Sequence, residues 1–110
     1  MKIDQVRRHA LSLPDSSEAP HFHFSSFRVK GRIFVTVPPD EARLHVFVDE
    51  DVREQALALD PEFLEKLFWG GKALGLRVTL ADADEAVVEA LVRKAWEHRS
   101  RPARRRAKRP

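Results

Sequence analysis

Two histidines in this chain have the residue type and spacing that could bind a metal ion. His21 and His23 alternate in sequence, so an extended chain would turn both imidazoles to the same side, as a bound metal ion requires. Zinc sites usually need three or four ligands, and no cysteine or further histidine stands at a motif spacing from this pair. We therefore expect no metal site, and we assign both histidines to a loop or the start of a strand, hydrogen-bonded to neighbouring backbone.

Two carboxylate clusters could perform general acid–base chemistry or hold a divalent cation. The first is residues 49–51, and the second comprises Asp82, Asp84 and Glu85. Each directly precedes a predicted helix, where acidic side chains accept hydrogen bonds from free N–H groups and oppose the helix dipole. We assign them to helix capping. Because the chain has no Gly-x-Ser-x-Gly, Walker or Gly-x-Gly-x-x-Gly motif, we expect no catalytic residue, no cofactor and no enzyme activity.

Basic residues give the strongest indication of a partner. Residues 99–110 contain seven lysines and arginines and no acid, whereas residues 1–98 contain 13 against 17 acidic residues, a net charge of −4. A segment with this charge attracts phosphates of DNA or RNA without sequence specificity. Its candidate contacts are Arg104, Arg105, Arg106, Lys108 and Arg109. The alternative is a solubilising tail without a dedicated partner, and in both cases we expect residues 99–110 to be disordered.

The stretch FHFSSFRVKGRIFVTVPPD predicts a hairpin with a basic tip. Residues 27–30 and 32–37 are predicted strands, joined at Gly31, which can adopt the positive φ of a two-residue turn. In this register Phe27 pairs with Phe34, and both face the core. The tip then presents three candidate phosphate contacts: Arg28, Lys30 and Arg32. The alternative is an ordinary hairpin whose exposed basic residues prevent edge pairing.

Hydrophobic periodicity predicts the remaining elements. Helices are predicted over residues 2–12, 51–59, 61–68 and 82–98, and strands over 43–48 and 74–80. Residues 15–21 are small, polar or proline and predict a loop. The order α-β-β-β-α-α-β-α indicates an α+β domain over residues 1–98, with an antiparallel four-stranded sheet and helices packed on one face.

The composition also predicts a compartment. The chain has no cysteine, no apolar run near the ~18–20 residues that span a bilayer, and no apolar segment typical of a secretory signal at its N-terminus. We therefore expect a cytoplasmic protein with no membrane partner. The sequence does not indicate the oligomeric state.

Several motifs together resemble a known family. They are LSLPDSSE after the opening helix, the hairpin stretch quoted above, DPEF, and GLRVTLADADEAVVEALVRKAW. Their spacing is similar to that of the MmcQ/YjbR family of small bacterial proteins, over roughly residues 1–98. The resemblance implies a compact domain of frataxin-like architecture and a DNA-binding role through wing-like hairpins. Members often carry a tryptophan just before the last strand, where this chain has Leu74-Gly75, and Trp69 lies a few residues earlier.

A second function stays open beside nucleic-acid binding. Aromatic residues on both sides of the chain's centre could line a pocket for a small molecule or a protein partner. The candidate lining residues are Phe22, Phe24, Trp69 and Lys72.

Overall fold

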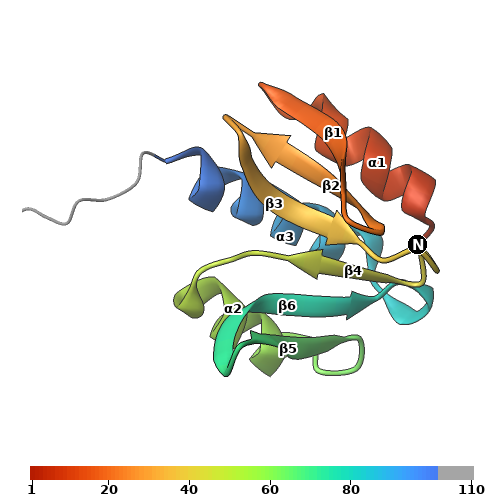
Figure 1. Ribbon diagram of the computed structural model, residues 1–110. Helices are drawn as coiled ribbons and strands as arrows, with labels where there is room; N and C mark the ends of the chain where they lie inside the picture. Colours follow the sequence, from red (N-terminus) through yellow and green to blue (C-terminus); the bar gives the residue numbers. More distant parts are fainter. Residues whose placement is uncertain (102–110) are drawn as a thin grey trace, which may run out of the picture.

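A six-stranded antiparallel sheet organises the computed structural model, which describes residues 1–101 (Figure 1). The elements are α1 (Ile3–Ser12), β1 (Ser16–His21), β2 (Phe24–Val29), β3 (Arg32–Val37), β4 (Arg43–Val46), α2 (Glu50–Leu59), β5 (Leu64–Trp69), β6 (Lys72–Thr79), a 3₁₀ turn (Leu80–Asp82) and α3 (Glu85–Ser100). The strand order is β1-β2-β3-β4-β6-β5. All three α-helices lie behind the sheet in Figure 1, and no element within residues 1–101 covers its other side, here called the open face.

The predicted α+β class is confirmed, with an antiparallel sheet and helices on one face. The predicted strand count and element order are wrong, because the sheet has six strands rather than four. The two strands that the sequence did not reveal are β1 and β5, which form the two edges of the sheet.

Strand β1 replaces the loop predicted over residues 15–21. Its sequence, SSEAPH, lacks the β-branched and aromatic residues that usually mark a strand. It nevertheless pairs with β2 along its whole length, from Ser16 opposite Val29 to His21 opposite Phe24. A proline is tolerated in this strand because an edge strand needs only one side of its backbone for pairing.

Strand β5 replaces the helix predicted over residues 61–68. Short apolar runs fit both helix and strand, and the spacing of Leu64 and Leu67 favoured the helix. Gly70 and Gly71 have φ values of 58° and 82°, so they form a two-residue hairpin turn rather than a helix end. This turn pairs β5 with β6 and adds the second edge strand.

The β2–β3 hairpin forms at the predicted turn but with a different register. Lys30 and Gly31 have φ values of 53° and 78°, as a two-residue turn requires. Phe27 pairs with Val35 and not with Phe34, because the register shifts at a β-bulge beside Phe27. Phe34 and Val35, although neighbours in sequence, are therefore both fully buried.

The core lies between the sheet and the helices. A row of fully buried cross-strand neighbours crosses β2, β3, β4 and β6: Phe27, Val35, Val46 and Leu76. Helix α3 contributes Val88, Val92 and Ala95 to the same buried cluster, and α1 contributes Val6 and Ala10. Burial of each large apolar side chain stabilises the domain by about 1.5–3 kcal/mol. No helix within residues 1–101 has the length and apolarity needed to cross a membrane.

Helix capping accounts for the acidic clusters, as predicted. Asp49 accepts a hydrogen bond from the backbone N–H of Val52 at 3.0 Å, at the start of α2. Asp84 does the same at the start of α3, accepting from Ala86 at 2.9 Å. Helix α3 then continues to Ser100, two residues beyond the predicted end of the domain.

Gly75 allows the end of β4 to cross close to β6. A Cβ atom on this residue would overlap the carbonyl oxygen of Val46 and lie 3.0 Å from the Cα of Phe47. Both neighbours are backbone atoms, which cannot move aside as the end of a flexible side chain can.

We expect Gly75→Ala to lower the free energy of unfolding by about 3 kcal/mol or more, as overpacking in a well-packed interior does. Urea denaturation monitored by circular dichroism measures this change. Gly70→Ala is the control, because a Cβ there meets nothing within 4 Å. Gly70→Ala should lower the free energy of unfolding by about 1 kcal/mol, because alanine is strained in the left-handed conformation of this residue. Equal losses in the two variants would contradict this explanation of Gly75.

Candidate functional site

A row of mostly polar residues crosses all six strands on the open face. Residues paired across antiparallel strands project to the same side of a sheet. In strand order, the register aligns Ala19, Ser26, Thr36, His45, Arg77 and Glu65. Hydrogen bonds join neighbours along this polar row: Ser26 Oγ donates to the carbonyl oxygen of Ala19 at 2.7 Å, and Arg77 Nη1 donates to Glu65 Oε1 at 2.8 Å.

His45 lies at the centre of the polar row, between an arginine and a threonine. Its Nε2 lies 3.5 Å from Arg77 Nε, and its Nδ1 lies 3.3 Å from Thr36 Oγ1. An arginine can only donate, so Nε2 accepts, and Nδ1 carries the proton of the neutral ring. Burial lowers the pKa of His45, and the charges of Arg77 and Arg43 lower it further.

Beside the polar row, three arginines line a single hollow of about 400 Å³. They come from three different elements: Arg28 from β2, Arg32 from β3 and Arg99 from α3. The other lining residues are His21, Gly31, Ile33, Thr36 and Phe47. Among the residues that the structure describes, none that lines this arginine hollow carries a carboxylate.

The C-terminal end of α3 is fixed against the β2–β3 hairpin by two cations. Arg32 Nη1 donates to the carbonyl oxygen of Arg101 at 2.6 Å, and Lys30 Nζ donates to that of Ser100 at 3.4 Å. Carbonyls at a helix C-terminus lack intrahelical donors and carry the negative end of the helix dipole. These contacts therefore stabilise the helix end and bring Arg99 next to Arg32.

Among the described side chains of the arginine hollow, that of Arg99 has a buried nitrogen without a hydrogen-bond partner. Its Nε is buried and finds no hydrogen-bond partner within residues 1–101. Its guanidinium carbon lies 5.4 Å from the centre of the Phe47 ring, within range of a cation–π interaction. Burial lowers the pKa of Arg99, and the nearby charge of Arg32 lowers it further. An anion bound in the hollow would supply a countercharge to this guanidinium group.

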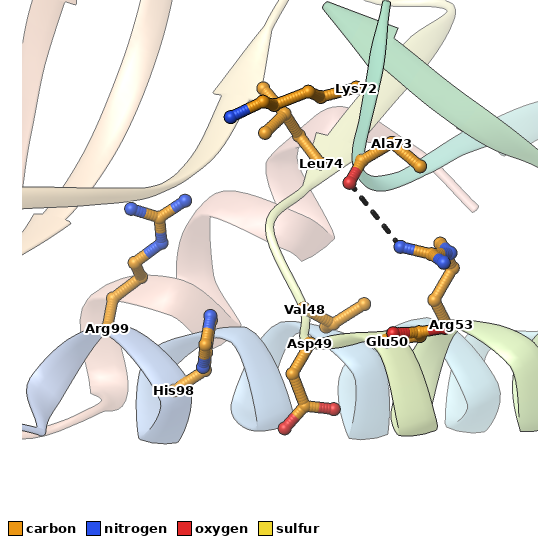
Figure 2. A pocket seen from close by; sticks show the side chains of 9 residues that line it. All are labelled: Val48, Asp49, Glu50, Arg53, Lys72, Ala73, Leu74, His98 and Arg99. Carbon is orange, nitrogen blue, oxygen red and sulfur yellow. Dashed lines mark hydrogen bonds between the residues drawn. The ribbon is translucent and has the colours of Figure 1, made fainter. Parts of the chain in front are cut away.

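Arg99 also lines a second hollow, of about 500 Å³, shown in Figure 2. The side chains of Lys72 and Arg99 extend into the same open space there, while the carboxylate of Asp49 points away from them. Arg53 turns to the opposite side and donates from Nη1 to the carbonyl oxygen of Ala73 at 3.4 Å. We call this the lysine hollow. Arg99 lines both hollows and so links Arg28 and Arg32 with Lys72, and we call these four residues the basic strip. Asp49 and Glu50 also line the lysine hollow.

The three predicted hairpin cations lie together, but they do not form a free tip. Arg28 donates to Ser26 Oγ at 3.1 Å and to the carbonyl oxygen of Pro20 at 3.2 Å, and Lys30 and Arg32 bind the end of α3. The predicted contacts Arg104, Arg105, Arg106, Lys108 and Arg109 lie outside the described residues. The described chain ends at Arg101, directly beside Arg32.

The four residues proposed to line one aromatic pocket do not lie together. Phe22 and Phe24 line a hollow of about 570 Å³ at the β1–β2 turn, whereas Lys72 lines the lysine hollow. Trp69 ends β5, at the opposite edge of the sheet from β1. The prediction of a single pocket is therefore wrong. Positions along the sequence did not indicate how far apart these residues lie across the sheet.

The two histidines do not lie side by side in one extended segment, as a metal-binding pair would require. The chain turns at Phe22, whose φ is 59°, and His23 lies in this turn. His21 lines the arginine hollow instead, and its ring packs edge-on against Phe22 at 4.8 Å. Within residues 1–101, no group of three or more histidines and carboxylates is close enough to hold a metal ion.

Sequence reasoning missed Arg99 and Phe47. The run of positive charge predicts that the domain ends before Arg99 and that Arg99 belongs to the basic tail. Helical spacing could have revealed it: Val88, Val92 and Ala95 are buried on α3, and position 99 continues the same face. Phe47 follows β4, and no pattern in the sequence indicates that it meets the end of α3.

The comparisons with known proteins agree with this architecture. A family model described as YjbR matches residues 11–98. The chain is also similar to the crystal structure of the Deinococcus radiodurans protein DR2400, which contains a DUF419 domain. The TM-score is 0.73 and the sequence identity 23%, over 86% of this chain and 75% of that chain. At this identity the likeness supports the fold. No curated protein matches the sequence.

We expect inorganic phosphate to stabilise the protein more than chloride at equal ionic strength, because it can accept from the arginine hollow. A gain of about 1 kcal/mol would raise Tm by roughly 4–8 °C in a domain of this size. Differential scanning fluorimetry measures the shift. Arg99→Gln should abolish the difference between the two salts, whereas Arg93→Gln, on the exposed side of α3, should retain it. Equal shifts in phosphate and chloride would contradict the anion site.

The lowered pKa values of His45 and His98 predict a loss of stability in mild acid. Burial is the main cause for both, and Arg99 further lowers the pKa of His98. The unfolded chain then binds more protons than the folded chain, so the free energy of unfolding falls as pH drops below about 6.5. Urea titrations at about pH 7.5 and about pH 5.5 measure this. His45→Gln should reduce the difference, and an unchanged difference would contradict the assignment to His45.

Proposed function

The chain belongs to the YjbR family, and we propose that this member binds nucleic acid without sequence specificity, through phosphate contacts on the basic strip. The observation that carries the proposal is the arginine hollow. It combines three guanidinium groups, no lining carboxylate within the described residues, and the buried, unpartnered Nε of Arg99. Such a site is electrostatically incomplete until an anion occupies it.

Phosphate is the anion that suits this geometry. A guanidinium is planar and can donate two parallel hydrogen bonds to phosphate oxygens, which makes arginine a preferred phosphate-binding residue. The lysine hollow extends the basic strip beyond the first phosphate, so a strand of nucleic acid could follow it from Arg28 to Lys72. Phosphate contacts carry no sequence information, which is why the proposed binding is non-specific.

The distribution of charge along the chain supports the proposal of nucleic-acid binding. Residues 1–98 have a net charge of −4, so cations gathered on one strip orient the protein toward a polyanion. The segment after Arg101 adds five further cations to the chain. Each phosphate neutralised contributes about −0.9 to the salt dependence of binding to duplex DNA and about −0.7 with a single strand.

The proposed role is binding without catalysis or a cofactor. The acidic residues Asp49 and Asp84 are engaged as helix caps, and His45 is hydrogen-bonded on both ring nitrogens. These contacts give the three side chains structural roles, although their types often act as general acids or bases.

We expect Arg28→Gln and Arg99→Gln each to weaken binding of fluorescein-labelled DNA by about tenfold, the value of roughly one charge-assisted phosphate contact. Each should also reduce the slope of log affinity against log salt by about 1. Fluorescence anisotropy at several salt concentrations measures both quantities. Arg93→Gln serves as the matched control and should change neither.

A shortened chain of residues 1–101 separates the basic strip from the segment that follows it. If the shortened chain still binds DNA, with a shallower salt dependence than the full chain, the basic strip contributes as proposed. If only the full chain binds, residues 102–110 act as a generic polycation, and the proposal for the basic strip is wrong.

A further inference from the structure

Two aromatic side chains at the tip of the β5–β6 hairpin stand in solvent. Trp69 is 76% exposed and Phe68 is 59% exposed. The other tryptophan, Trp96, packs against the core and donates from Nε1 to the carbonyl oxygen of Pro14 at 2.9 Å. Folding of the domain therefore makes use of Trp96 and leaves Trp69 without a packing role within residues 1–101.

Trp69 lies beside the basic strip. It pairs with Lys72 directly across the turn, and paired residues project to the same side of a sheet, with Cβ atoms roughly 4.5–5.5 Å apart. Lys72 extends into the lysine hollow together with Arg99 (Figure 2). The turn between the pair is Gly70-Gly71, where added Cβ atoms would meet nothing within 4 Å, so the approach to the indole is open.

We propose that Trp69 is a stacking platform for an unpaired base, and that the basic strip together with Trp69 selects single-stranded nucleic acid over duplex. The inference rests on the proposed function and adds the class of nucleic acid. A phosphate held between Lys72 and Arg99 would bring an adjacent base within reach of the indole. A single strand offers free base faces for stacking, whereas the bases of a duplex are already stacked on one another.

Phe22, the third exposed aromatic residue within residues 1–101, lacks this setting. It is 89% exposed, but no lysine or arginine of the described chain lines the hollow in which it lies, so no cation there could hold a phosphate. Exposure alone therefore does not single out Trp69. Its position beside Lys72 does.

Anisotropy with the full chain tests the inference, using a labelled single-stranded DNA and the duplex that it forms with its complement. The wild-type chain should bind the single strand more tightly. Trp69→Ala should weaken single-strand binding about fivefold or more and leave duplex binding unchanged, since stacking on one aromatic side chain contributes on this scale. Trp69→Phe should keep most of the preference. Leu59→Ala is the matched control, because Leu59 is also 76% exposed but lies at the far end of α2.

Intrinsic fluorescence gives a second readout that a merely structural role would not produce. Single-stranded DNA should quench the wild-type emission, and Trp69→Phe, in which Trp96 is the remaining tryptophan, should lose the quenching. Urea midpoints confirm that the variants fold.

If Trp69→Ala lowers the affinity for both DNA ligands by the same factor, or for neither, the stacking role is wrong, and the proposed function still stands. If the wild-type chain binds the single strand and the duplex with equal affinity, the stacking role is likewise wrong and the proposed function still stands. If the wild-type chain binds neither ligand, the proposed function fails, and the inference fails with it.

Discussion

The contact between the end of α3 and the β2–β3 hairpin is the constraint on which the candidate site depends. The carbonyls of Ser100 and Arg101 have no donors within the helix, and Lys30 and Arg32 supply them from the neighbouring hairpin. This contact holds Arg99 close to Arg32, although two cations repel each other. The apolar face of α3 is buried along most of its length and keeps the last turn in position despite this repulsion. The arginine hollow is therefore a product of the packing of α3 and not of the hairpin alone.

The two faces of the sheet carry different kinds of side chain. The row of Phe27, Val35, Val46 and Leu76 faces the helices and supplies the buried area that stabilises the domain. An antiparallel sheet can leave its second face in water, and this face carries the polar row with His45 at its centre. Hydrogen bonds within that row give polar groups that are wholly or partly buried the partners that water would otherwise supply.

The sequence predicted the inner part of the sheet well and its edges poorly. The turn at Lys30-Gly31 follows from glycine chemistry, and the alternation of β6 follows from half-burial. Edge strands bury less surface, so β1 shows no alternation, and β5 has apolar spacing that also fits a helix. Of the candidate site, the hairpin cations could be identified from their charge. Helical spacing places Arg99 on the buried face of α3, but its contacts with Arg32 and Phe47 depend on the fold and not on the spacing.

We propose that nucleic acid binds to the basic strip. Backbone amide chemical shifts of the full chain, followed by NMR during titration with a single-stranded oligonucleotide, test it most directly. We expect the largest changes at residues 28–32, Phe47, Lys72 and residues 98–101, where the two hollows lie. Changes confined to residues 102–110, or centred on the Phe22 turn or on α1, would contradict it.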